Sequence, residues 1–236
     1  MRSSNDRHRM FVLGQELLET IVPEERLARL DAVLSQRLSG LTVLLEDLHH
    51  PQNMGACVRT VEAFGLTDVY VVDRAEDPFR PTHKVTRGGQ KWVDTHRFRD
   101  IDKALDTLEA RGFRILATLP DGSMGGASRS QALETVDFSV PTCLCFGNEL
   151  EGVSETVARR AHGTFSLPMW GFTRSFNVSV ALGIALWEAA GARRRALGRD
   201  GDLGPEALAE LRGRLLTRSN RTAKRLAAAM GRGVPR

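Results

Sequence analysis

The residues best suited to chemistry in this chain occur in three short polar segments. They are Asn53 and Arg59, six positions apart, then Glu149, and finally Ser175 and Asn177. Amide, hydroxyl, carboxylate and guanidinium groups bind and orient polar ligands through hydrogen bonds. Each also has a purely structural explanation, because asparagine and serine cap helices and a carboxylate is common on a surface.

The third segment has the arrangement expected of a loop that holds a small molecule against the start of a helix. A short apolar strand stops at Pro168, a loop containing Gly171 follows, and a helix runs from about Val178 through Trp187. Two polar side chains flank Phe176 immediately before that helix. Exposure to solvent would not require this arrangement, whereas a bound ligand would.

Apolar strands alternate with amphipathic helices along most of the chain. We expect strands over 41–45, 68–72, 92–98, 113–118, 142–146 and 164–167, and helices over 24–39, 53–64, 101–111, 154–161, 178–187 and 206–229. This alternation predicts an α/β fold, with a parallel sheet covered by helices on both faces. The three polar segments each follow a strand, so we expect them to meet at the carboxyl edge of the sheet. The chain lacks a glycine-rich dinucleotide fingerprint and a phosphate loop, which disfavours dinucleotide and ATP binding.

The composition is that of a soluble globular protein. Hydrophobic residues make up 42% of the 236 positions and charged residues 26%. No apolar run approaches the length of a membrane helix, and the N-terminus does not resemble a signal peptide. Three cysteines without zinc-site spacing indicate reduced core thiols, so we expect a cytoplasmic protein with no metal and no membrane partner.

Positive charge is concentrated in the last fifth of the chain. Residues 189–236 contain 12 Lys and Arg against 4 Asp and Glu, whereas residues 41–188 contain 15 against 19. This asymmetry indicates contact with a nucleic acid, although a solvated helix face would look similar. We expect a flexible arm over 1–23, a catalytic domain with its N-terminal helix over 24–196 and a basic helical extension over 197–236.

The three polar segments, in this order and spacing, resemble the signature motifs of SPOUT-class (TrmH-type) RNA ribose 2′-O-methyltransferases. The resemblance rests on Asn53-x5-Arg59, on Phe146 to Ser154, and on Leu167 to Ser179. It covers about residues 26–196. The stretches 49–53 and 90–93 are most similar to the branch that methylates the D-loop guanosine of tRNA. Methylation of ribosomal RNA or of another tRNA position is an alternative, and so is a non-catalytic knotted RNA-binding protein.

The resemblance implies a parallel sheet with a deep C-terminal trefoil knot, a homodimer that builds each site from both chains, and S-adenosylmethionine as cofactor. The residues it places at the cofactor are Thr118, Leu119, Gly147, Leu167, Met169 and Phe176. It assigns Arg59 the central catalytic place. Because a guanidinium does not give up its proton at neutral pH, we expect Arg59 to bind a phosphate or stabilise an alkoxide.

The resemblance also implies roles for the remaining polar residues. Asn53 would orient Arg59 or the ribose, Glu149 would orient the motifs, and the polar pair at 175 and 177 would bind the loop or the target nucleotide. The candidate RNA-binding cations are Arg87, Lys91, Arg193, Arg194 and Arg195. The chain departs from its relatives at 86–89, at 120–130 and at 189–192, which affects RNA docking more than methyl transfer.

Overall fold

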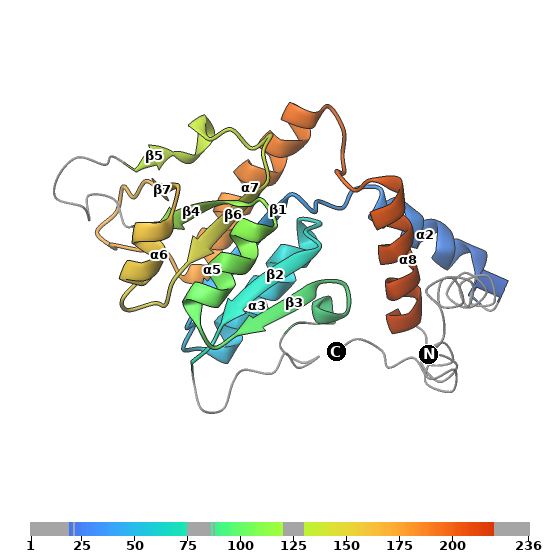
Figure 1. The fold of residues 1–236 in the computed structure, drawn as a ribbon, viewed down its shortest axis with the longest axis horizontal. Helices are drawn as coiled ribbons and strands as arrows, with labels where there is room; N and C mark the ends of the chain where they lie inside the picture. Colours follow the sequence, from blue (N-terminus) through green and yellow to red (C-terminus); the bar gives the residue numbers. More distant parts are fainter. Residues whose placement is uncertain (1–18, 21, 75–85, 87, 120–129, 220–236) are drawn as a thin grey trace. The chain divides into compact units, whose positions relative to one another are not determined.

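The computed structural model describes residues 19–20, 22–74, 86, 88–119 and 130–219 (Figure 1). Its contacts divide the chain into two compact units. One comprises residues 38–202 and contains the sheet, and the other combines residues 1–37 with residues 203–236. The helix that we expected within the catalytic domain therefore groups with the C-terminal segment instead.

The larger unit is built on a seven-stranded sheet in which every neighbouring pair is parallel. The strands are β1 Leu41–Glu46, β2 Asp68–Val72, β3 Asp94–Phe98, β4 Arg114–Thr118, β5 Gln131–Ala132, β6 Thr142–Phe146 and β7 Gly163–Ser166. Their order is β3-β2-β1-β6-β4-β7-β5. The predicted parallel sheet is confirmed. Sequence reasoning missed β5, which is too short for a periodic pattern.

Helices cover both faces of this sheet, as the alternation predicted (Figure 1). They are α3 Pro51–Ala63, α5 Ile101–Ala110, α6 Glu155–Arg160 and α7 Val178–Leu197. One core cluster joins α3 and α7 to inward side chains such as Leu45, and the other joins α5 and α6 to side chains such as Leu44. Successive residues of β1 thus serve opposite cores, as strand geometry requires.

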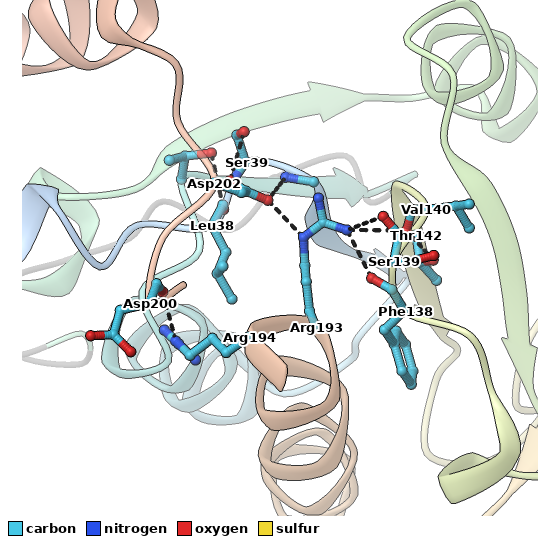
Figure 2. A network of polar contacts seen from close by, with 12 residues as sticks. Leu38, Ser39, Phe138, Ser139, Val140, Thr142, Arg193, Arg194, Asp200 and Asp202 are labelled. Carbon is cyan, nitrogen blue, oxygen red and sulfur yellow. Dashed lines mark hydrogen bonds and ion pairs between the residues drawn. The ribbon is translucent and has the colours of Figure 1, made fainter. Parts of the chain in front are cut away.

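The C-terminal half of α7 is fastened by a buried ion pair at the amino edge of the sheet (Figure 2). Arg193 Nε lies 2.6 Å from the Asp202 carboxylate, and its Nη1 donates to the carbonyls of residues 138, 139 and 140. Asp202 also accepts from the backbone N–H groups of Ser39, at 2.5 Å, and of Gly40, at 2.9 Å. Both ionic side chains are nearly inaccessible to solvent.

This burial corrects the prediction that Arg193 contacts RNA. The side chain is enclosed and its donors bind protein acceptors, so it is not available to a phosphate. A Cβ on Gly40 would lie 1.9 Å from Arg193 Nη2, which shows how closely the guanidinium approaches the start of β1. A larger residue at this position would have to displace the guanidinium from its carboxylate and carbonyl partners.

The smaller unit contains α2 Glu24–Leu34 and α8 Pro205–Ser219. Arg212 forms ion pairs with Asp31, at 2.6 Å, and with Glu19. Part of the basic C-terminal charge therefore stabilises the unit itself. The predicted α2 is five residues too long, and the predicted continuation of α8 to 229 lies outside the described residues. Within the described chain, no helix has the length and hydropathy needed to cross a bilayer.

Candidate active site

The loop after β6 is a tight turn that projects Glu149 from the carboxyl edge of the sheet. Asn148 Oδ1 accepts hydrogen bonds from the N–H groups of Leu150, at 2.9 Å, and of Glu151, at 2.7 Å. The backbones of Asn148 and Gly152 pair with each other at 3.1 Å in both directions. The turn is thereby closed on itself, which fixes the position of Glu149.

Gly147 is required by the close approach of backbone within this turn. A Cβ at this position would lie 1.8 Å from the Gly152 carbonyl oxygen and 2.1 Å from the Val153 nitrogen. Both obstacles are main-chain atoms, which cannot move aside as a flexible side chain can. Gly152 itself has a φ of 72°, in the left-handed region that favours glycine.

Three of the predicted site residues form one chain of hydrogen bonds across the three motifs. Asn53 Nδ2 donates to Glu149 Oε1 at 2.5 Å, and Asn177 Nδ2 donates to Asn53 Oδ1 at 3.1 Å. The backbone N–H of His49 approaches Glu149 Oε2 at 3.4 Å. The turn after β6 and the starts of α3 and α7 are thus connected directly.

This chain of contacts keeps Glu149 ionised. Partial burial opposes the charged form, but the hydrogen bonds from Asn53 and from backbone N–H groups outweigh it and lower the pKa of Glu149 below its ordinary value. The pKa of the buried Cys57 thiol is shifted in the opposite direction, upward. Burial, with a smaller contribution from Glu149, raises the pKa of its thiol to about 12, so Cys57 is not a thiolate nucleophile.

The structure distinguishes the capping residues from the others. Asn177 is the N-cap of α7, because its Oδ1 accepts from the N–H of Ser179 at 2.9 Å. Its amide nitrogen remains available for Asn53. Asn53 itself lies inside α3, whose N-cap is His50, so capping does not explain it. Ser175 is exposed, two residues before the cap.

Arg59 is exposed on α3 and has no hydrogen-bond or ion-pair partner among the described residues. The short 3-10 turn η1, Gly89–Lys91, packs beside it, since a Cβ on Gly89 would lie 3.5 Å from Arg59 Cα. Lys91 at the end of this turn is also exposed. A free guanidinium and an exposed ammonium therefore come from adjacent elements.

The predicted cofactor residues come from the carboxyl ends of β4, β6 and β7, which are neighbours in the sheet. Thr118 Oγ1 donates to the Cys145 carbonyl, and the N–H of Leu119 donates to the Phe165 carbonyl at 3.0 Å. Leu167 and Met169 are half-buried on the segment leaving β7, and Phe176 is 38% exposed.

A buried carboxylate at the end of β1 escaped sequence reasoning. Glu46 is 2% exposed, and its Oε2 accepts from the N–H of Ser154 at 2.9 Å, which anchors the far end of the turn that carries Glu149. Arg74 lies 3.5 Å from Glu46 Oε1 and also pairs with Asp47. The available signal was a glutamate at the end of a strand whose other residues are four apolar side chains and one threonine, because a charge in such a strand requires partners.

The other predicted RNA-binding cations differ in their surroundings. Arg194 is half-buried and donates to the carbonyls of Asp200, at 2.8 Å, and Phe64, at 3.1 Å. Arg195 is exposed and pairs with Glu188 at 2.9 Å. Arg87 lies outside the described residues. Within the described ranges, no cluster of three His, Cys, Asp or Glu side chains is arranged to hold a metal ion.

Replacing Gly147 by alanine is expected to lower the free energy of unfolding by about 1–3 kcal/mol, the usual cost of overpacking, because the added methyl overlaps fixed backbone. Denaturant unfolding measures the change. Gly204→Ala is the matched control, because a Cβ there meets open space. An unchanged free energy of unfolding in Gly147→Ala would mean that the turn after β6 opens to admit a side chain.

Known proteins are similar to this chain over most of its length. Residues 40–187 match the model of the SpoU rRNA Methylase family. A protein of Thermus thermophilus, named tRNA (guanosine(18)-2′-O)-methyltransferase, is 38% identical over 176 residues, which cover 73% of this chain and 86% of the relative.

Solved structures are similar over most of the chain. The TrmH/SpoU tRNA modifying enzyme of A. aeolicus aligns with a TM-score of 0.72 and 30% identity. The alignment covers 83% of this chain and 97% of the A. aeolicus chain. A second similar structure is that of the SpoU methyltransferase AviRb of Streptomyces viridochromogenes in complex with the cofactor AdoMet. It aligns with a TM-score of 0.55 and 26% identity, over 70% of this chain and 62% of the AviRb chain.

Proposed function

We propose that this chain, which belongs to the SpoU rRNA methylase family, transfers a methyl group from S-adenosylmethionine to RNA. The acceptor is the ribose 2′-hydroxyl of guanosine 18 in tRNA. The observation that carries the proposal is the hydrogen-bonded chain from Glu149 through Asn53 to Asn177, together with Arg59, which has no partner among the described residues. The buried, unpaired thiols are compatible with work in the cytoplasm.

The residues at the carboxyl edge suit S-adenosylmethionine. Half-buried Leu167 and Met169 offer apolar surface to an adenine ring, and the backbone N–H groups of Met169 and Phe176 have no partner among the described residues. Thr118, Leu119 and Gly147 would complete this site. A dry slot with a few amide partners is the usual way to hold such a ligand. The bound cofactor supplies an electrophilic methyl group.

Arg59 is assigned to the reacting nucleotide. A ribose hydroxyl is a poor nucleophile that must lose its proton as it attacks, so positive charge beside the developing alkoxide lowers the barrier. A planar guanidinium with several donors can hold a phosphate in a fixed orientation at the same time. Because the guanidinium stays protonated, we assign proton acceptance to a phosphate oxygen of the substrate.

The hydrogen-bonded chain orients this reaction. Ionised Glu149 fixes the amide of Asn53, and Asn53 in turn fixes the amide of Asn177 at the start of α7. Alignment of this kind accelerates a transfer between two bound groups without any change in their reactivity. Ser175 lies two residues before Asn177 in the sequence, and we assign it to the side of the site that faces the RNA.

A trefoil knot in the C-terminal part is the topology that we propose for this sheet. It is supported by the strand order, in which β7 lies between β4 and β5 although it follows both in sequence. Knots are very rare among protein folds. Mechanical extension from the two termini should therefore give a fully unfolded chain shorter than the contour length of an open polypeptide of this size, and full extension would refute the knot.

A homodimer is supported by an exposed apolar face on α7. Val180, Ile184 and Trp187 are 48%, 42% and 75% exposed and share one helix face by their spacing. Trp187→Glu should shift the protein to monomers in light scattering at micromolar concentration, because a buried interface tryptophan contributes about 2 kcal/mol or more. Ala110→Glu on α5 is the matched control. A Trp187→Glu protein that remains dimeric would exclude this face.

Methylation of defined transcripts tests the function. Purified protein with labelled S-adenosylmethionine should modify unmodified tRNA and lose that activity when guanosine 18 is replaced by adenosine. Mapping the modified nucleotide in total RNA that lacks 2′-O-methylation separates this substrate from ribosomal RNA or another tRNA position. Failure to bind the cofactor at all would favour a non-catalytic RNA-binding protein.

A further inference from the structure

Two aromatic side chains project into solvent beside the site and have no part in the chemistry assigned above. Trp170 and Phe172 are 91% and 109% exposed, on the loop between β7 and α7. Gly171 separates them, and a Cβ there would meet only the Thr173 hydroxyl at 3.9 Å, so the space around the loop is open. Aromatic rings carry large apolar surfaces that folding normally buries.

The position of this loop limits what can cover the two rings. It begins directly after Met169, on the cofactor side, and ends at Ser175, on the side assigned to RNA. Phe172 is three residues from Ser175, so their Cα atoms are at most about 11 Å apart. The rings therefore lie within reach of any nucleotide that is held at the site.

The charge around the rings suits a polyanion. Arg174 is exposed and has no partner among the described residues, as is also true of Arg59. The carboxylate of Glu149, in the candidate site, accepts a hydrogen bond from Asn53. Flat apolar rings on the same loop as an exposed guanidinium match a nucleic acid, which combines phosphates with bases that stack on aromatic and arginine planes.

We infer that Trp170 and Phe172 form a stacking platform for an unpaired base of the RNA substrate, at or next to the nucleotide that is methylated. This inference rests on the proposed function and deepens it. A ribose within a folded RNA loop becomes accessible only when its nucleotide leaves its stacked position, at a cost of a few kcal/mol. Stacking of the displaced base on these rings offsets that cost.

Alanine substitution tests the platform. Trp170→Ala and Phe172→Ala should each raise the KM for tRNA and the Kd for tRNA about tenfold or more, with the double variant weaker still. Calorimetric affinity for S-adenosylmethionine and mass in light scattering should remain unchanged. Trp170→Phe and Phe172→Tyr, which keep an aromatic ring, should restore most of the RNA affinity.

Three outcomes would overturn the inference. Dissociation of the alanine variants into monomers would assign the rings to a second copy of the chain. Loss of cofactor affinity would assign them to the cofactor site. RNA binding equal to that of the wild type would show that no base stacks there.

Fluorescence gives a readout that does not depend on turnover. In a Trp92→Phe, Trp187→Phe variant, Trp170 is the only tryptophan, and stacking on a base should quench its emission as tRNA is added. Unchanged emission at saturating tRNA would exclude contact with Trp170. The wild-type methylation assay separates the two proposals, because absence of methylation on every RNA refutes the function, whereas binding and quenching still decide the platform.

Discussion

Substitution of Arg59 by lysine is expected to lower kcat for RNA methylation about a hundredfold to a thousandfold, the usual effect of removing one donor that stabilises transition-state charge. Lysine keeps the positive charge but lacks the planar fork that holds a phosphate through two parallel hydrogen bonds. Arg59 is exposed and has no hydrogen-bond or ion-pair partner among the described residues. The melting temperature and the cofactor affinity of the Arg59→Lys protein should therefore equal those of the wild type.

Single-turnover kinetics with saturating tRNA measure this effect. Arg159→Lys is the matched control, since Arg159 is exposed on α6 and its one ion pair within the described part of the chain is a long one, 3.9 Å from Glu155. If Arg59→Lys turned over at close to the wild-type rate, Arg59 would not act by holding a phosphate through two hydrogen bonds. Its positive charge alone would then account for its role.

Substitution of Asp202 by alanine should destabilise the protein by about 3–5 kcal/mol, the range found when one partner of a buried ion pair is removed. The change leaves the Arg193 guanidinium buried without its counter-ion and removes the acceptor for the N–H groups of Ser39 and Gly40. Denaturant unfolding measures the loss. Asp200→Ala is the matched control, because Asp200 is exposed. If Asp202→Ala lowered the free energy of unfolding by less than about 1 kcal/mol, the buried ion pair would not stabilise the fold as assigned.

The same ion pair predicts a dependence of stability on pH. Burial opposes ionisation of Asp202, but the N–H groups of Ser39 and Gly40 and the Arg193 guanidinium lower its pKa below the ordinary value. A lowered pKa in the folded state adds stability above the unfolded value of about 3.9, and that stability is lost as the pH falls through the folded pKa. The stability difference between wild type and Asp202→Asn should therefore shrink below about pH 4, and a constant difference would refute the coupling.

Sequence patterns were sufficient for the sheet and for the three motifs, because strand alternation and polar residues after strands depend on local chemistry. Several boundaries depended on tertiary contacts instead. The third strand begins at Asp94, two residues later than predicted, because η1 occupies Gly89–Lys91 and Trp92 is its C-cap. Glu46 was missed because its partner Ser154 is 108 residues away in the chain.

The arginine run at 193–195 shows why composition misled us about one residue. Successive helix positions point about 100° apart, so three adjacent arginines on α7 face three environments. Arg193 faces the protein interior, Arg194 reaches backbone carbonyls and Arg195 reaches Glu188 at the surface. A count of charges cannot distinguish these directions, which are set by how α7 packs.

The contact between Ser39 and Asp202 joins the second and the last residue of the sheet-bearing unit. The polypeptide therefore enters and leaves this unit at one point. Domains whose ends meet tolerate insertion and exchange of the segments attached to them. The sheet-bearing unit is in this sense a self-contained module, and the segments before and after it are attached at a single point of its amino edge.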